Sequence, residues 1–591
     1  MADINAADKT SVFQLKQWLG LNESPDGDTG LKLGEAAVMR NFRITGEGHL
    51  QIRPGYGAKC TLAKDAPVQG MWFGHIGGNP HFVAACGGRM WDIDTASWQA
   101  RDVGEMDDAP THFFGFDEKV YALTGSEYYC WDGEGALTIV EGYIPVVVSA
   151  ASPEGGGTLL ERVNLLNGKR RVKYSPDGIA KTFTLPEREV DEVLDVEGTD
   201  AAWSLDKTAG TVIFDSPPGE GINTVVITYR KGDGERSRVT AMRFSELYNG
   251  DADSRVFLYG DGTYKTVYSD LDQAGRPTAE YFPDMNEMTV GEANTPITAM
   301  IRHYDRLIVY KSDGAYSTDH GTVTLETGAV AAAFYTAPLN REIGCGAAGQ
   351  ALLVENNPRT LHGRAVYEWT LAGNSTRDER NAKRISDRVE STLGAFDLTQ
   401  CICFDDGLRQ EYYVVCGHEA AVNNYGNGTW YYYSNFPALC MECVDGEVFF
   451  GTPDGRLMCL SRQYRNDDLA PIDAYWESGS MDFGREWRRK YSAGIWVSVQ
   501  TESQARLQVT AQSNRKSEHA VKDVAAGLST FANVNFGHWS FNTNRKPQVQ
   551  RVRLKVKKFT FCKLVISSNS ASGTGTVLAA DFQVRYTGNV K

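Results

Sequence analysis

Apolar and polar residues alternate with a period of two along most of the chain, and Gly, Asp and Asn interrupt the alternating runs. This pattern is typical of antiparallel β-strands joined by tight turns, because successive side chains of a strand point to opposite faces of a sheet. Helical spacing is scarce. Only 11–20 (SVFQLKQWLG) and 34–42 (GEAAVMRNF) are predicted as short helices, so the pattern predicts an all-β protein.

A unit made of an apolar run, a D-G or G-G type turn and a second alternating run recurs along the chain. It occurs at 81–94, 119–133, 255–270, 306–319, 351–370, 411–434 and 447–461. Apart from one long gap, the spacing of these units suits the roughly 40–50 residues of a β-propeller blade. A blade can cover its apolar face only with the next blade, so we expect a closed propeller of about six to eight blades.

The long gap is explained by an insertion. Residues 151–236 open with SPEGGG, close with YRKGDGERSR and contain four or more strand patterns, which predicts a small β-sandwich in a propeller loop. Residues from about 471 alternate strongly and predict a second sandwich. The expected segments are a leader with the lead-in to the first blade (1–60), blades (61–150), the inserted sandwich (151–236), blades (237–470) and a basic C-terminal sandwich (471–591).

Charge is distributed unevenly over these segments. The net charge of the 591 residues is −15, yet residues 485–591 contain 18 Lys and Arg against 5 Asp and Glu. An acidic body with a basic end predicts two surfaces that face different neighbours. In a strand, Arg551, Arg553, Lys555 and Lys557 of QRVRLKVKK would share one face. This row is either a solvated outer face of the sandwich or a docking surface for an acidic neighbouring ring or copy.

Motifs of enzymes and metal sites are weak in this sequence. No G-x-S-x-G, H-E-x-x-H or G-x-x-x-x-G-K-[ST] occurs, and SPDGDTG (24–30) and YSPDGIAKTF (174–183) share only fragments with sialidase Asp-boxes. We interpret the acidic pairs Asp405–Asp406 and Asp467–Asp468 as solvated loop charge. The loop 249–254 (NGDADS) lacks the ligand spacing of an EF-hand. We therefore expect no catalytic residue, no metal and no cofactor.

Cysteines and aromatic residues are predicted to serve the core. The eleven cysteines include Cys401, Cys403 and a C-x-x-C at Cys440 and Cys443. Residues i and i+3 of a strand point to opposite faces, so buried, reduced thiols are expected here rather than zinc ligands. The run TWYYYS (429–434) would bind sugars only if it were exposed, and burial in blade packing is expected. No apolar run is long enough to span a bilayer, and the first residues lack a secretory signal, which predicts folding in a cytoplasm.

Three stretches resemble β-propeller proteins of tailed bacteriophages. Residues 20–56 (GLNESPDGDTGLKLGEAAVMRNFRITGEGHLQIRPGY) contain a G-E-x-x-x-x-x-N-F-x-x-x-x-G-x-L-x-x-R-P-G sequence like the one that precedes the first blade there. TWYYYSNFPALCMECVDGEVFFGTPDGRLMCLS (429–461) looks like their last blade. WESGSMDFGREWRRKYSAGIWVSVQ (476–500) looks like their passage into a C-terminal sandwich.

Within that family the sequence is most similar to tail nozzle or tail-tube proteins of short-tailed phages. The resemblance implies a non-enzymatic virion subunit that forms a ring with copies of itself, commonly a hexamer. Its partners would be portal or adaptor proteins and tail fibres or spikes, and genomic DNA would pass through during ejection without specific binding. Two other functions remain open: a receptor- or glycan-binding propeller at the tail tip, and a glycan hydrolase.

Overall fold

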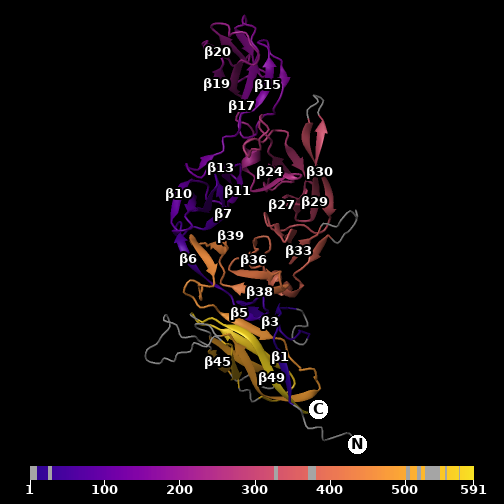
Figure 1. Ribbon diagram of the computed structural model, residues 1–591. Helices are drawn as coiled ribbons and strands as arrows, with labels where there is room; N and C mark the ends of the chain where they lie inside the picture. Colours follow the sequence, from indigo (N-terminus) through magenta and orange to yellow (C-terminus); the bar gives the residue numbers. More distant parts are fainter. Residues whose placement is uncertain are drawn as a thin grey trace. The chain divides into compact units, whose positions relative to one another are not determined.

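The computed structural model describes residues 10–23, 30–324, 330–370, 381–500, 506–514, 521–525, 546–552, 556–571 and 573–590. Their regular secondary structure consists almost entirely of β-strands (Figure 1). The described helices are α1 (Ser237–Thr240), the 3₁₀ turn η1 (Asp387–Val389) and α2 (Glu390–Ala395). None of the described helices has the length and apolar character needed to cross a bilayer. The all-β prediction is confirmed.

The chain divides into two compact units. One comprises Met1–Val68, Gly363–Trp369 and Ala382–Lys591, and the other comprises Gln69–His362 and Thr370–Asn381. Each unit contains several small antiparallel sheets, and seven of the described sheets have four strands.

Four successive four-stranded sheets belong to the second unit, apart from the first residue of β7. Their strands are β7 (Val68–Ile76), β8 (Asn79–Cys86), β9 (Arg89–Ile93), β10 (Ala100–Glu105); β11 (His112–Phe116), β12 (Lys119–Leu123), β13 (Tyr128–Trp131), β14 (Thr138–Ile139); β23 (Phe244–Asn249), β24 (Ala252–Tyr259), β25 (Lys265–Tyr268), β26 (Glu287–Thr289); and β27 (Ile297–His303), β28 (Arg306–Lys311), β29 (Gly314–Thr324), β30 (Val330–Asn340). In each sheet the strands pair in chain order, so every sheet is a simple meander.

Neighbouring sheets of this unit share apolar cores. Val83 of β8 and Val120 of β12 belong to one buried cluster. Tyr121 of β12 and Leu258 of β24 belong to the next cluster. The sheets β23–β26 and β27–β30 likewise share a cluster that contains Phe257. Each of these four sheets therefore shares an apolar core with the next one in the chain.

Between the second and third of these sheets lies a pair of sheets with a separate core. A five-stranded sheet has the order β16-β15-β17-β22-β19 and a three-stranded sheet has the order β18-β21-β20. Their bounds are β15 (Val146–Ala151), β16 (Thr158–Leu159), β17 (Lys169–Tyr174), β18 (Thr182–Thr184), β19 (Glu192–Glu197), β20 (Trp203–Asp206), β21 (Thr211–Phe214) and β22 (Val225–Arg230). One buried cluster, with Tyr174, Phe183 and Phe214 in edge-to-face contact, belongs to these strands.

The remaining four-stranded sheets lie later in the chain. They contain β31 (Leu352–Val354), β32 (Asn357–His362), β33 (Ala365–Trp369), β34 (Ala382–Arg384); β35 (Ile402–Asp406), β36 (Glu411–Cys416), β37 (Glu419–Asn424), β38 (Thr429–Ser434); and β39 (Cys440–Val444), β40 (Glu447–Gly451), β41 (Arg456–Ser461), β6 (Gly55–Thr61). In the last of these the fourth strand comes from the N-terminal part of the chain, where Gly55 of β6 pairs with Ser461 of β41.

The N-terminal segment also joins the C-terminal strands (Figure 1). A seven-stranded sheet has the order β4-β5-β49-β43-β46, with β1 beside β49 and β47 beside β43, and a six-stranded sheet has the order β2-β3-β42-β48-β44-β45. Their bounds are β1 (Ser11–Leu15), β2 (Gly20–Leu21), β3 (Glu35–Arg40), β4 (Phe42–Ile44), β5 (Leu50–Ile52), β42 (Ala474–Ser478), β43 (Arg488–Val499), β44 (Arg506–Ser513), β45 (Val521–Ala525), β46 (Gln548–Val552), β47 (Val556–Phe559), β48 (Cys562–Ser568) and β49 (Thr576–Asn589). Trp18 is buried against Trp476 with the ring centroids 4.8 Å apart.

The two short helices predicted at 11–20 and 34–42 are wrong. These segments form β1, β2, β3 and the start of β4. Ser11 pairs with Val584, and Met39 pairs with Trp476. Strand partners from the far end of the chain decide the conformation here, because β-structure depends on tertiary context more than on local propensity.

Gly55 provides a test of how tightly β6 is held. An added Cβ at Gly55 would lie 2.2 Å from the carbonyl oxygen of Asn466, whereas an added Cβ at Gly46 would contact nothing within 4 Å. We expect Gly55→Ala to lower the free energy of unfolding by about 1 to 3 kcal/mol, as overpacking does. The matched Gly46→Ala variant should stay within about 0.5 kcal/mol of the wild type. Urea unfolding measures both, and equal stabilities would contradict the close approach.

Candidate functional site: a buried polar network around the N-terminal motif

The arginine of the R-P-G sequence forms a buried ion pair. Nη2 of Arg53 lies 2.6 Å from Oδ2 of Asp467, and the two side chains are 0% and 1% exposed. Nη1 of Arg53 donates to Oδ1 of Asp467 at 2.8 Å, so the contact is bidentate. A bidentate arginine–carboxylate pair fixes both distance and orientation. The pair joins the link between β5 and β6 to the segment that follows β41.

All the N–H groups of the Arg53 guanidinium are used inside the chain. Besides the two bonds to Asp467, Nε donates to Oδ1 of Asn41 at 2.9 Å, Nη1 to the carbonyl oxygen of Pro54 at 2.9 Å and Nη2 to the carbonyl oxygen of Ser434 at 3.0 Å. An arginine carries five such donors, so none is left without an acceptor. This saturation offsets the cost of removing the charge from water.

Asn41, the asparagine of the motif, connects the same groups. Its backbone has a φ of 56°, a left-handed conformation that asparagine tolerates better than most residues. Its Nδ2 donates to Oγ of Ser434 and to the carbonyl oxygen of Asp473, both at 2.9 Å. Its Oδ1 also accepts from the backbone N–H of Ser434 at 2.9 Å. Asn41 thus joins the N-terminal segment to the end of β38 and the start of β42.

The residue after Gly55 completes this arrangement with an aromatic contact. The ring of Tyr56 lies 5.1 Å from that of Phe450, nearly perpendicular to it, and its hydroxyl donates to the carbonyl oxygen of Asn435 at 2.9 Å. Burial, and next the Asp467 carboxylate, raise the pKa of Tyr56, so the hydroxyl stays a donor. Arg53, Asn41 and Tyr56 of the motif therefore make contacts that stabilise the fold.

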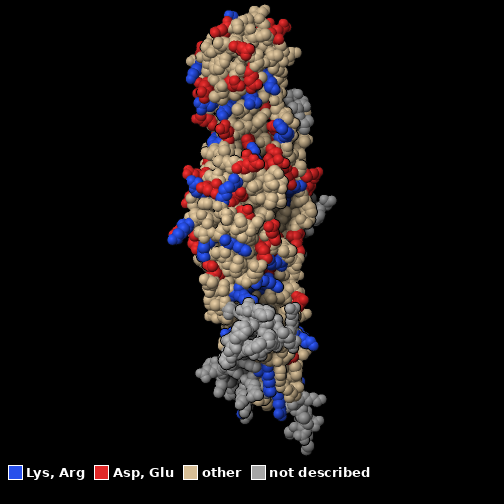
Figure 2. Space-filling model, turned by 60° about the vertical axis from the view of Figure 1, so that its left-hand side comes forward, with Lys and Arg blue, Asp and Glu red and all other residues tan. Residues whose placement is uncertain are grey.

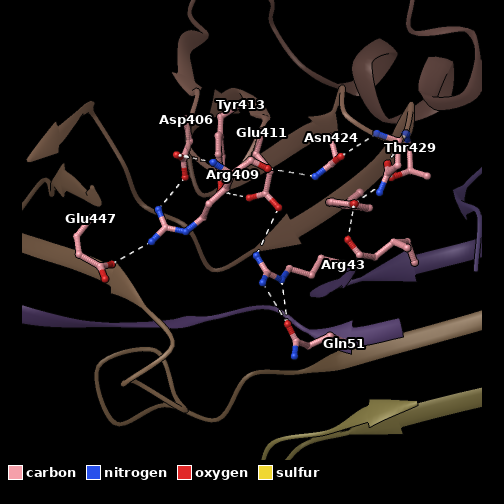
Figure 3. A network of polar contacts seen from close by, with 12 residues as sticks. Arg43, Gln51, Asp406, Arg409, Glu411, Tyr413, Asn424, Thr429 and Glu447 are labelled. Atoms are coloured by element: carbon pink, nitrogen blue, oxygen red, sulfur yellow. Dashed lines mark hydrogen bonds and ion pairs between the residues drawn. The ribbon is translucent and has the colours of Figure 1, made fainter. Parts of the chain in front are cut away.

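A second group of charges lies nearby and is drawn in Figure 3. Arg43 of β4 lies between Glu411 and Gln51: Nη1 is 3.5 Å from Oε1 of Glu411, and Nε and Nη2 donate to Oε1 of Gln51 at 3.2 and 3.1 Å. The hydroxyl of Tyr413 donates to Oε2 of Glu411 at 2.7 Å. Burial raises the pKa of Glu411 above its usual 4.5, and the Arg43 charge opposes that effect only in part.

The interpretation of the acidic pairs Asp405–Asp406 and Asp467–Asp468 as solvated loop charge is wrong for one member of each pair. Asp406 is 0% exposed and lies 2.8 Å from Nη1 of Arg409, and Asp467 is the buried partner of Arg53. Arg409 also reaches Glu447 at 3.2 Å, and Arg456 pairs with Asp468. A carboxylate can be buried when an arginine neutralises it, and the partner of Asp467 is 414 residues away in the sequence. No local pattern shows such a partner.

A cavity of about 600 Å³ opens beside Arg53. Its lining includes the basic residues Arg462 and Arg465, His49 and one acidic residue, Glu47. Nε2 of His49 lies 3.3 Å from Oε2 of Glu47, so this imidazole and this carboxylate face each other. Within the described residues no group of three or more His, Cys, Asp or Glu is placed to hold a metal ion.

The predicted basic row is described only in part. Arg551 on β46 is exposed, and its guanidinium carbon lies 5.1 Å from the centroid of the Trp496 ring. Arg553 and Lys555 lie outside the described residues, and Lys557 is described only as a backbone position of β47 opposite Tyr491. The docking role of Arg551, Arg553, Lys555 and Lys557 stays a prediction.

Three of the four aromatic side chains on β38 are buried, as expected from the sequence. Trp430, Tyr431 and Tyr433 are each at most 1% exposed. The indole N–H of Trp430 donates to the carbonyl oxygen of Ile385 at 3.1 Å, and the hydroxyl of Tyr431 donates to that of Ile44 at 3.1 Å. These rings are not available to stack on a sugar.

The acidic loop 249–254 is engaged by an arginine. Arg302 pairs with Asp253, and its Nη2 donates to the carbonyl oxygen of Asp251 at 3.3 Å. The cation that these oxygens contact is therefore a guanidinium of the chain itself.

No protein-family model matches the chain, and no curated protein sequence matches it. The computationally designed Ika8 protein is similar at 12% identity, over 68% of this chain and 99% of its own, with a TM-score of 0.32. The AfRom2 CNH domain is similar at 7% identity, over 69% and 99%, with a TM-score of 0.32. An exo-β-1,3-galactanase from Phanerochaete chrysosporium is similar at 8% identity, over 90% and 100%, with a TM-score of 0.19. Similarities at these scores carry no argument about fold or function.

Removing one partner of the Arg53–Asp467 pair should strongly destabilise the protein. We expect Asp467→Asn to lower the free energy of unfolding by about 3 to 5 kcal/mol, because it leaves a buried guanidinium without its counter-ion. Arg40 and Asp473 form the matched control, since they pair at 2.5 Å but are 37% and 55% exposed. Asp473→Asn should cost about 0 to 1 kcal/mol. Equal losses in urea unfolding would contradict the role of burial.

Glu411 should give the protein a measurable pH dependence. Its pKa is raised in the folded state, so the folded protein binds more protons than the unfolded chain above pH 4.5, and stability falls as pH rises. We expect wild type to lose stability relative to Glu411→Gln over this range in urea unfolding.

Asp454 supplies a control of opposite sign. Burial opposes its ionisation, but hydrogen bonds from Thr452 and Arg456 prevail and lower its pKa below 3.8. Wild type should therefore lose stability relative to Asp454→Asn as pH falls through 3.8. The same sign for both variants would contradict the assignment.

Proposed function

We propose that the chain is a non-enzymatic structural subunit of a tailed-bacteriophage virion. In this proposal it is a ring-forming tail nozzle or tail-tube protein that provides the DNA exit channel and a seat for neighbouring tail proteins. The observation that carries the proposal is the place of the N-terminal motif: Arg53 and Asn41, which belong to the stretch that resembles the phage proteins, form a buried hydrogen-bond network with Asp467. A motif whose residues stabilise the fold is consistent with a structural subunit.

The proposed architecture is a β-propeller. The seven described four-stranded sheets would be its blades, and the sheets of β15–β22 and of β42–β49 would be the inserted and C-terminal sandwiches. Two observations support this: successive sheets share apolar cores, and the last sheet takes its fourth strand, β6, from the N-terminal part of the chain. A blade shared between the two chain ends is a way to close a ring of sheets.

The distribution of charge supports an assembled role. In the space-filling view Lys and Arg predominate over Asp and Glu on the visible surface at the lower end, where the C-terminal strands lie (Figure 2). A basic end and an acidic remainder favour contact between unlike surfaces of neighbouring subunits. An acidic channel would also let DNA pass, because basic walls would bind phosphates by releasing counterions.

The purified chain should assemble into rings of one stoichiometry, commonly six copies, that electron microscopy and mass photometry can count. If the basic row docks on an acidic neighbour, the ring fraction should fall steeply as salt is raised. It should also fall when Arg551, Arg553, Lys555 and Lys557 are all changed to Ser. A chain that stays monomeric at every concentration, alone and in particles, would contradict the ring. Specific binding on a glycan array would favour a receptor-binding propeller instead.

A further inference from the structure

Two cysteines stand opposite each other at the open end of one β-hairpin. β35 and β36 pair antiparallel from Asp406 opposite Glu411 to Ile402 opposite Val415. The next pair in the same register is Cys401 and Cys416. Directly opposed Cα atoms of antiparallel strands are about 4.5 to 5.5 Å apart. This range falls within the roughly 4.4 to 6.8 Å found between the Cα atoms of disulfide-bonded cysteines.

The side chains of this pair converge on one acceptor. The thiol of Cys401 donates to the carbonyl oxygen of Asp397 at 3.4 Å, and the thiol of Cys416 approaches the same oxygen at 3.8 Å. Both sulfurs thus lie near the same oxygen atom at the open end of the hairpin.

The two thiols differ in exposure. Cys401 is 3% exposed, and burial, together with the neighbouring Cys416, raises its pKa. Cys416 is partly exposed. Because a thiol reacts as the thiolate and must be reached by its reagent, Cys416 is the thiol that reacts first.

The pair is distinctive among the eleven cysteines, all of which carry thiols. Cys403 stands opposite Val414, and Cys440 and Cys443 stand opposite Gly451 and Val448. In the strand pairs of the described residues no other two cysteines face each other.

We propose that Cys401 and Cys416 form a modification site, at which a small-molecule disulfide such as oxidised glutathione converts the two thiols to an intramolecular disulfide. The Cys416 thiolate attacks one sulfur of the reagent, forms a mixed disulfide and releases one glutathione thiolate. The Cys401 sulfur then attacks the Cys416 sulfur and releases the second. The protein thiols are oxidised by two electrons, the reagent is reduced to two thiols, and the two cysteine protons end on the released glutathione molecules.

The test uses the folded full-length chain. It is incubated with oxidised glutathione, treated with N-ethylmaleimide to block remaining thiols and digested with trypsin without reduction. Cleavage after Arg409 places Cys401 on peptide 389–409 and Cys416 on peptide 410–456. We expect these two peptides to be linked, and to separate when the digest is reduced.

Three variants identify the bridge. Cys401→Ser should lose the linked peptides and retain one glutathionyl group on Cys416. Cys416→Ser should lose the link and most of the reaction of this cysteine pair with oxidised glutathione. Cys403→Ser is the matched control, because Cys403 lies on the same peptide as Cys401 but faces a valine, and it should keep the link. A wild-type protein that stays unbridged or carries only mixed disulfide at Cys416 would overturn the proposal. A link that persists in Cys401→Ser or disappears in Cys403→Ser would overturn it too.

Discussion

Arg53 and Asp467 form an ion pair that is removed from water. The surrounding polar groups offset part of the free-energy cost of burying these two charges. Arg53 also donates to Asn41 and Ser434, and Asp467 accepts a further hydrogen bond from Asn435. A buried pair of this kind adds little net stability when complete, but it penalises every arrangement in which one partner is missing. It therefore specifies which segments meet: the N-terminal motif, the end of β38 and the segment before β42.

This constraint links the first part of the chain to the last. The ionic partners are 414 residues apart, β6 completes the sheet of β39–β41, and β1 to β5 join the strands that follow residue 473. Contacts of such long range require the intervening chain to close into a loop, which has an entropic cost. The N-terminal segment therefore reaches its final conformation only when the C-terminal strands are present, which explains why its local sequence pattern is a poor guide to its structure.

Much of the fold could be predicted from alternation alone. Each of the seven recurring sequence units contains a hairpin of a different four-stranded sheet, because alternation and turn residues are local properties that the strands keep. The N-terminal strands cannot be predicted from local alternation, because their partners are distant in the sequence. Only part of the candidate site can be predicted from the sequence. The R-P-G sequence indicates Arg53, whereas the local sequence around Asp467 and Asp406 is typical of loop carboxylates. Their burial depends on Arg53 and Arg409, whose positions only the tertiary structure reveals.

The hairpin of β35 and β36 is stabilised by different interactions at its two ends. At its turn end Asp406 and Glu411 are opposed, and Arg409 and Arg43 bind them in the network of Figure 3. At its open end the opposed residues are Cys401 and Cys416, held by weak thiol hydrogen bonds to Asp397. A covalent link would act where the ionic contacts do not reach. Its effect would then be largest on local opening of the strand ends, since the turn end is already restrained.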